Sequence, residues 1–156
     1  MKYALIILVR NEIEGITKIF DQIPLNRFDE VLAIDGMSSD GSVEFLEKKG
    51  IKVITQIVNG RGQAFRDAFN NTVSDILVFY GPDGNENPLD IVQFIQEFDN
   101  NKSAGMVVAR RLGPKAVNKE DFKIFKPRKW VNVVFNMMAN LFWNKDSYVY
   151  DTINGF

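Results

Sequence analysis

The sequence contains neither cysteine nor histidine. Without cysteine the chain has no disulfide, no thiolate nucleophile and no cysteine-bound zinc. Without histidine it has no Ser-His-Asp apparatus, no histidine-based zinc hydrolysis and no imidazole general base. Any chemistry must therefore use carboxylates, Arg or Lys, backbone amides, or a hard metal ion bound through oxygen.

The chain also lacks a strong charge of either sign, because 19 Lys and Arg balance 20 Asp and Glu over 156 residues. No basic arm is present, so nucleic acid is not an expected partner. The first apolar run, Tyr3 to Val9, is too short and too soon followed by charge for a signal peptide or a membrane span, and a cytoplasmic location is expected. A hydrophobic content of 46% at this length predicts one globular domain, residues 1–156.

Short apolar runs alternate with segments of helical period along the first two thirds of the chain. Strands are predicted at Tyr3–Val9, Val31–Asp35, Lys52–Gln56, Asp75–Tyr80 and Ala104–Ala109. Helices are predicted at Glu12–Gln22, Ser39–Lys49, Gly62–Thr72 and Pro88–Phe98. This alternation predicts an α/β fold with a mostly parallel sheet and helices on both faces.

Two acids stand at or just after the ends of predicted strands: Asp35 closes the run VLAID, and Asp83 closes DILVFYGPD. The carboxyl edge of a parallel sheet is where ligands bind, and two acids there indicate a cationic, hydroxylated or metal-bound ligand. A nucleoside diphosphate with its metal is the commonest ligand of this kind. Asp35 is a candidate acceptor for a nucleobase NH or a ribose hydroxyl. Asp83 and Asn85, with Glu86 as a further candidate, offer oxygen ligands for Mg²⁺ or Mn²⁺. Either acid could instead be an ordinary turn residue.

Two further segments offer positive charge or free amides to a phosphate. Gly60, Arg61 and Gly62 stand at a predicted helix start, where backbone amides and the helix dipole favour anions. Phe65 occupies the position of a third glycine, which argues against a dinucleotide fingerprint. Arg110, at a predicted strand end, could clamp a phosphate or lie on a solvated loop.

Beyond Arg111 a polar loop leads to an apolar stretch, Arg128–Trp143, with helical period. Its polar members Asn132, Asn136 and Asn140 mark one narrow uncharged face. A helix this apolar is buried in the core, or it lies on a partner or a membrane.

Taken in order, seven segments resemble the motifs of family 2 glycosyltransferases with the GT-A fold, and especially those of dolichyl- or polyprenyl-phosphate sugar synthases. The resemblance covers nearly the whole chain. The segments are LVRNE (Val9, Arg10, Asn11, Glu12), IDGMSSDGS (Asp35, Ser38, Asp40), GRGQA (Gly60, Arg61, Gly62, Ala64), GPDGNENP (Pro82, Asp83, Asn85), VVAR (Arg110), RKWVNVVFNMMANLF (Arg128, Asn136) and DTINGF (Asp151, Asn154, Gly155).

This resemblance implies an inverting transfer of sugar from a UDP- or GDP-sugar to a lipid phosphate or a glycan. The first four segments would bind the nucleotide sugar, with Mg²⁺ or Mn²⁺ at Asp83 and Asn85. Arg110, Arg128 and Asn136 would face the acceptor, at or near a membrane surface. Asp83 and Arg110 would act in catalysis, and Asp151 would be the base if the acceptor were a hydroxyl.

The chain departs from the family pattern at two acids, since Gly81 replaces the first acid of the metal motif and Gly36 the second acid of the nucleotide motif. Loss of a carboxylate weakens a hard-cation site. The sequence also stops at Phe156, where family members continue, so it is expected to be a truncated catalytic domain: residues 1–111 as the nucleotide-sugar half and 112–156 as the start of the acceptor half. A degenerate module that binds without turnover, or a nucleotidyltransferase, remains an alternative.

Overall fold

The computed structural model describes residues 1–84, 87–101, 103–108, 134, 137–138 and 141. The chain divides into two compact units, Met1–Val107 and Val108–Phe156. The sheet and its covering helices all belong to the first unit.

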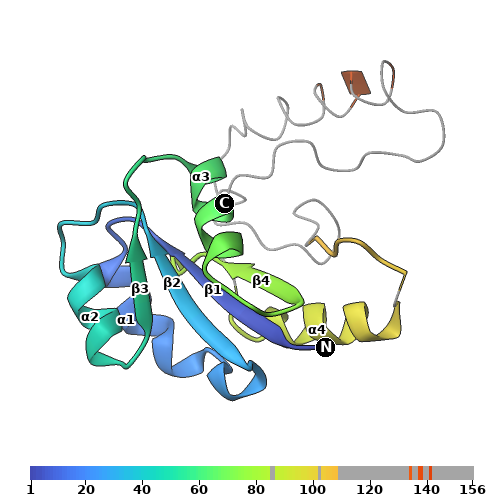
Figure 1. Ribbon diagram of the computed structural model, residues 1–156, viewed down its shortest axis with the longest axis horizontal. Coiled ribbons are helices and arrows are strands. Elements are labelled where there is room, and N and C mark those ends of the chain that lie inside the picture. Colours follow the sequence, from blue (N-terminus) through green and yellow to red (C-terminus); the bar gives the residue numbers. More distant parts are fainter. Residues whose placement is uncertain (85–86, 102, 109–133, 135–136, 139–140, 142–156) are drawn as a thin grey trace, which may run out of the picture. The chain divides into compact units, whose positions relative to one another are not determined.

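Four parallel strands form one sheet in the order β3-β2-β1-β4 (Figure 1). Their bounds are β1 Tyr3–Val9, β2 Glu30–Asp35, β3 Lys52–Thr55 and β4 Ile76–Tyr80. Asp35 lies between Val9 on one side and Thr55 on the other, so these three strands end at the same level. Tyr80 pairs with Ile7, and β4 therefore ends close to the same edge. The predicted α/β class with a parallel sheet is confirmed.

The helices are close to the segments predicted from the sequence. They are α1 Ile13–Ile19, η1 Phe20–Gln22, η2 Leu25–Arg27, α2 Ser42–Lys48, α3 Arg61–Asn70 and α4 Asp90–Asn100, where η marks a 3-10 helix. The predicted helix Glu12–Gln22 is thus an α-helix followed by a 3-10 turn. α2 begins three residues later than predicted, because Gly41 adopts a left-handed φ of 96° directly before it.

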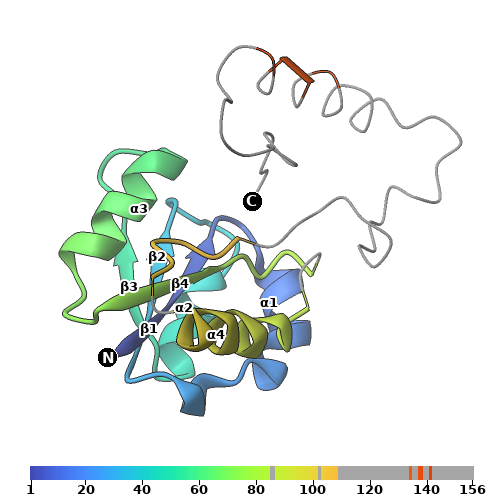
Figure 2. The same ribbon diagram turned by 90° about the vertical axis from the view of Figure 1, so that its right-hand side faces the viewer.

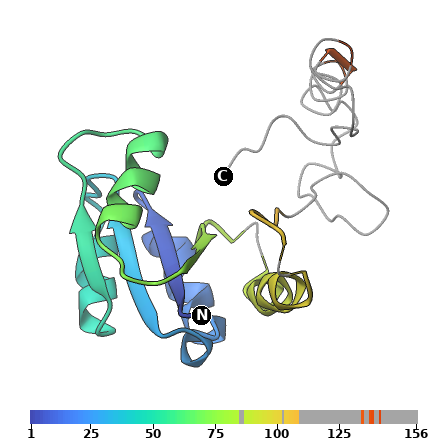
Figure 3. The ribbon, with the colours of Figure 1, turned by 45° about the vertical axis from the view of Figure 1, so that its right-hand side comes forward.

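Alternate residues of β1 enter opposite cores, as the period of a strand requires. Tyr3, Leu5, Ile7 and Val9 join a core with residues of α1, α2 and α4, whereas Ala4 and Ile6 join one with α3. Figure 2 shows α3 by itself on its side of the sheet, and Figure 3 shows the strand arrowheads pointing the same way. Small Ala64 and Ala68 allow α3 to approach the sheet closely.

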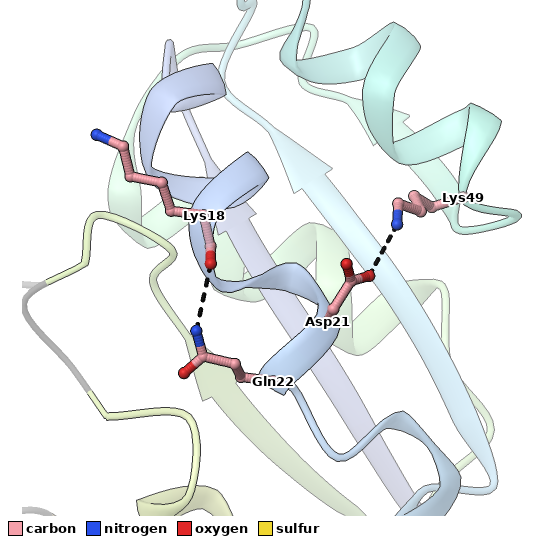
Figure 4. Close-up of polar contacts among 4 residues, drawn as sticks. All are labelled: Lys18, Asp21, Gln22 and Lys49. Atoms are coloured by element: carbon pink, nitrogen blue, oxygen red, sulfur yellow. Dashed lines mark hydrogen bonds and ion pairs between the residues drawn. The ribbon is translucent and has the colours of Figure 1, made fainter.

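An ion pair on the other face joins η1 to the end of α2 (Figure 4). Lys49 Nζ lies 2.8 Å from Asp21 Oδ1, and the same ammonium lies 5.0 Å from the centre of the Phe20 ring. The Gln22 side chain donates to the Lys18 carbonyl oxygen at 3.3 Å. Asp21 is 84% exposed, so the contribution of this ion pair to stability is small.

The strand predicted at Ala104–Ala109 is wrong over its described residues. Residues 104–108 form no strand, and Met106 and Val108 are exposed. Branched apolar residues favour a strand only where neighbouring strands and a core receive them. Within the described part of the chain, no strand pairs with this segment.

Four residues of the predicted helix Arg128–Trp143 are described. Val134, Met137, Met138 and Leu141 are helical, and all four side chains are exposed. They recur at intervals of three, four and seven residues, which is the spacing of one helix face. The remainder of this prediction lies outside the described residues.

Candidate functional site

The loop after β1 is tied to the loop after β2 by hydrogen bonds that use backbone amides. They run from Asn11 N to Ser38 Oγ at 2.9 Å, Ser39 N to Asn11 Oδ1 at 2.9 Å, Glu12 N to Ser42 Oγ at 3.0 Å and Ile13 N to Asp40 Oδ2 at 2.9 Å. Asn11 has a φ of 55°, a left-handed conformation that Asn tolerates better than most residues. The two loops therefore form one hydrogen-bonded unit at the carboxyl edge of the sheet.

Asp35 ends β2 with only 1% of its surface exposed. Its Oδ2 accepts a hydrogen bond from Met37 N and its Oδ1 accepts one from Ser38 N, both at 3.1 Å. Asp35 therefore organises the turn that follows it, as the simpler of the two interpretations expects. A carboxylate has about four lone-pair sites, so a role toward a nucleobase or ribose remains compatible and stays a prediction.

Asp40 is held in its charged form. Burial tends to raise its pKa, but hydrogen bonds from the Ser42 hydroxyl at 2.6 Å and from the Ile13 amide at 2.9 Å outweigh burial and keep the pKa below its ordinary value. Both carboxylate oxygens are engaged in this way. Asp40 therefore links the loop after β1 to the loop after β2 through these hydrogen bonds.

Glu12, the residue before α1, faces negative charge from two other loops. Its pKa is raised by burial, by the charge of Asp83 and by the charge of Asp40. Glu12 follows β1, Asp40 follows β2 and Asp83 follows β4. The carboxyl edge thus brings together three acids that are far apart in the sequence.

The two glycines that replace family acids differ in their surroundings. A Cβ at Gly36 would meet the Arg10 side chain at 3.2 Å, so the stem of Arg10 covers this position. Gly36 N also donates to Val9 O at 2.8 Å, at the end of β1. A Cβ at Gly81 would meet no atom of the described residues within 4 Å. The structure therefore has room for a side chain at position 81.

The predicted phosphate loop leads into α3 as the sequence analysis expected. Gly60 is the residue before the helix and has a φ of 150°, which favours glycine. The buried side chain of Gln56 holds this loop, donating to the Gly60 carbonyl oxygen at 3.1 Å. Arg61 and Gly62 are exposed in the first turn, and Ala64 is buried against the sheet.

Several predicted site residues lie outside the described part of the chain. These are Asn85, Glu86, Arg110, Arg128, Asn136, Asp151, Asn154 and Gly155. Among the other candidates in the metal motif, Pro82 is fully buried and Asp83 is half-buried.

Two residues that hold the site loops, Ser42 and Gln56, were not predicted from the sequence. Ser42 is fully buried, and its hydroxyl accepts from Glu12 N while donating to Asp40. Its signal was the pair Asp40 and Ser42, two residues apart, which is the spacing of a local turn hydrogen bond. Gln56 had no such signal, because it reads as the last residue of a strand.

The described residues do not form a metal site from protein atoms alone: Glu12, Asp40 and Asp83 lie at one edge, but no group of three acids in the described ranges is arranged to hold a metal ion. Both carboxylate oxygens of Asp40 already accept hydrogen bonds. Magnesium, however, is usually bound by one or two carboxylates together with substrate phosphates. Asp83, with its charge acting on Glu12, fits a divalent cation that is shared with a diphosphate.

A shallow hollow of about 300 Å³ lies on α3, lined by Phe65, Arg66, Phe69 and Asn70. These residues belong to the later turns of the helix, which runs back toward the amino edge of the sheet. The hollow is therefore separate from the three acid-bearing loops.

The family model described as glycosyl transferase family 2 matches residues 4–153. The chain therefore belongs to this family of glycosyltransferases.

Individual relatives agree with this membership. The chain is 26% identical over 122 residues to Glycosyltransferase AglJ of Haloferax volcanii, covering 70% of the chain and 40% of that protein. Glucosyl-3-phosphoglycerate synthase from Mycobacterium tuberculosis, solved with Mn²⁺ and UDP-glucose, matches with a TM-score of 0.54 and 24% identity, over 67% of the chain and 40% of its own. The same enzyme has been solved with Mg²⁺ and UDP. The GT-A fold is thereby confirmed, and the chain spans about two fifths of the length of these relatives.

Within the described residues, no helix combines the length and apolar character needed to cross a membrane.

Proposed function

We propose that this chain is the donor-binding part of a glycosyltransferase that takes its sugar from a UDP- or GDP-sugar. The observation that carries the proposal is the convergence of Glu12, Asp40 and Asp83 from three loops at one edge of a parallel sheet. That edge is the usual ligand site of open α/β sheets. Family membership and the UDP-glucose bound by a protein of the same fold support it.

In this proposal the loops after β1 and β2 receive the nucleoside. Val9, Arg10, Asn11 and Glu12 form one side, and Asp35, Ser38 and Asp40 form the other. Because hydrogen bonds already join the loops, little ordering remains to be done when the nucleotide binds.

The diphosphate would lie between the start of α3 and the loop after β4. Gly60, Arg61, Gly62 and Ala64 offer backbone amides and one guanidinium, while Pro82 and Asp83 border the other side. A divalent ion held by Asp83 and Asn85 would neutralise charge on the diphosphate as it departs.

The proposed reaction is an inverting displacement at the anomeric carbon. An acceptor oxygen forms a bond to this carbon as the bond to the diphosphate oxygen breaks, and the electron pair leaves with the diphosphate. Arg61 stabilises the negative charge that develops on the leaving group. Arg110 faces the acceptor.

The proposed acceptor is a lipid phosphate or a glycan. A phosphate is ionised near neutral pH and needs no general base, which agrees with a chain that lacks histidine. A hydroxyl would need a base, and Asp151 is the candidate. Arg128 and Asn136 would lie on the acceptor side. Contact with a membrane surface is supported by the exposed apolar side chains of Val134, Met137, Met138 and Leu141. The proposed location is the cytoplasmic face of that membrane.

Calorimetric titration with UDP, GDP and their sugar conjugates, with and without Mn²⁺, tests this proposal. Binding of one nucleotide that strengthens with Mn²⁺ is the expected result. If no nucleotide binds to the folded chain under either condition, the proposal is wrong.

A second candidate is a module that binds a nucleotide sugar without turnover, and glycine at position 81 favours it. Binding without transfer, even in a longer chain that carries Gly81→Asp, would support this candidate over the first.

A further inference from the structure

Gly15 lies inside α1, where the loop after β4 passes against the helix. A Cβ built at Gly15 would lie 2.2 Å from the carbonyl oxygen of Pro82, 3.3 Å from its carbonyl carbon and 3.4 Å from Asp83 Cα. All three atoms belong to the backbone, so no side chain can rotate away to make room. Alanine is the better helix former, and the glycine is therefore explained by this close approach rather than by the helix.

We infer that Gly15 is a positioning residue for the proposed donor site, because its missing side chain lets the loop of Pro82 and Asp83 lie directly on α1. The effect of Gly15 on donor binding rests on the proposed function. The packing of Gly15 against Pro82 and Asp83 is independent of that function. By contrast, a Cβ at Gly36 would lie 3.2 Å from its nearest neighbour, and a Cβ at Gly41, Gly50, Gly60, Gly62, Gly81 or Gly105 would meet no described atom within 4 Å.

Of the two packed segments, α1 is the more firmly held. Hydrogen bonds anchor its first residues to the loop after β2, and Ile16, next to Gly15, is completely buried. On the other side, Pro82 is buried but the chain leaves Asp83 through Gly84, which is exposed and has a φ of 73°. A side chain at position 15 would therefore push Asp83 away from Glu12.

The expected size of the effect follows from the overlap. Real Cβ atoms essentially never come within 3.0 Å of such a neighbour, so the loop would have to move by roughly 1 Å. A displacement of about 1 Å at a functional group can cost on the order of 100-fold in activity.

The test compares Gly15→Ala with Gly105→Ala, a matched control whose Cβ would meet no heavy atom of the described part of the chain within 4 Å. Three quantities are measured: the nucleotide dissociation constant with Mn²⁺, the melting temperature, and the amide chemical shifts. For Gly15→Ala we expect a dissociation constant raised by one to two orders of magnitude, altered amide shifts at Asp83 and Gly84, and a retained cooperative melt. Gly105→Ala should match the unmodified chain in all three.

The outcomes separate this inference from the proposed function. If the unmodified chain binds nucleotide and Gly15→Ala binds it equally well, the inference is wrong and the proposed function stands. If the unmodified chain binds no nucleotide, the proposed function fails, and unchanged Asp83 and Gly84 amide shifts in Gly15→Ala would overturn the positioning as well. If Gly15→Ala does not fold, the unmodified chain is tested for nuclear Overhauser contacts between the α-protons of Gly15 and Asp83. The presence of these contacts supports the inference, and their absence overturns it.

Discussion

At the scale of single residues, the pKa of Glu12 reflects the negative charge that surrounds it at the site. Its pKa is raised by burial and by the charges of Asp83 and Asp40. Asp40 is fixed in its charged form by Ser42 and the Ile13 amide. Asp83 is the member of this group that the proposed function assigns to the diphosphate and its metal.

Replacement of Asp83 by Asn should lower the pKa of Glu12 toward the ordinary value of a glutamate. The substitution removes a negative charge that disfavours ionisation of Glu12, whereas burial remains. Titration of the Glu12 carboxyl carbon by NMR, without metal or nucleotide, measures this. Asp75→Asn is the control, since Asp75 is exposed and accepts from Lys2 N at 2.8 Å far from the site. An unchanged Glu12 pKa in Asp83→Asn would show that the two acids do not interact.

Introduction of the family acid by Gly81→Asp should be tolerated, because a side chain there meets no described atom within 4 Å. A second carboxylate beside Asp83 adds charge for a hard cation. We expect the Mn²⁺-dependent part of nucleotide binding to increase several-fold while binding without metal stays the same or weakens. Calorimetric titration in parallel with the unmodified chain measures both; equal gains with and without Mn²⁺ would argue against a metal at this position.

Sequence patterns located Asp35 and Asp83 because each follows an apolar run that had to be a buried strand. The same patterns could not show that the Asp35 carboxylate binds its own turn, or that Gly15 touches Pro82. The Asp35 contact is local, and the sequence had left a turn role open beside a ligand role without deciding between them. The Gly15 contact depends on how a loop from one part of the chain packs on a helix from another.

At the scale of elements, the described site is a pair of loops joined by hydrogen bonds. Ser42 is central to this pair, being fully buried, with its hydroxyl used as donor and acceptor at the start of α2.

Ser42→Ala should destabilise the fold by about 1–3 kcal/mol, since it leaves the partly buried Glu12 amide without its acceptor. Urea unfolding followed by circular dichroism measures the change. Ser103→Ala is the matched control, because the Ser103 hydroxyl bonds Asn101 on an exposed turn, and it should change stability by less than about 0.5 kcal/mol. Equal stabilities of the two variants would mean that the loops are not held together in this way.

The elements themselves were largely predictable from the sequence. β1 and the ends of β2 and β4 agree with the apolar runs, because buried strands need such runs. The segment after Asn101 was not predicted correctly. Its apolar residues have the pattern of a strand, but Met106 and Val108 are exposed. Whether an apolar run becomes a strand depends on a neighbouring strand, which local sequence does not contain.

At the scale of the whole molecule, the alternation of strands and helices predicted a parallel sheet but not the order of its strands. That order, with β1 between β2 and β4, is what brings Glu12, Asp40 and Asp83 to one edge. A long-range contact also joins two elements at the opposite edge of the sheet. The hydroxyl of Tyr3, at the start of β1, donates to Asp99 Oδ1, near the end of α4, at 2.7 Å.

This contact makes stability depend on alkaline pH. Burial and the hydrogen bond to Asp99 raise the pKa of Tyr3 from 10.0 to about 12. Between these values the folded chain keeps a proton that the unfolded chain loses, so this contribution is fully present below pH 10 and is lost as the pH rises toward 12. Tyr3→Phe should lower stability at pH 8 by about 1 kcal/mol and should lose less stability than the unmodified chain between pH 9 and about 11. Urea unfolding across this range is the measurement, and parallel pH curves for the two proteins would rule out the linkage.

The most direct test maps where a nucleotide binds, by following backbone amide shifts of the labelled chain during titration with UDP and with GDP in the presence of diamagnetic Mg²⁺. The account predicts the largest shifts at Asn11, Ser38 and Asp83, from the three loops at the carboxyl edge, and at Gly62 at the start of α3. Shifts confined to the later turns of α3, around the hollow of Phe65 and Phe69, would contradict it.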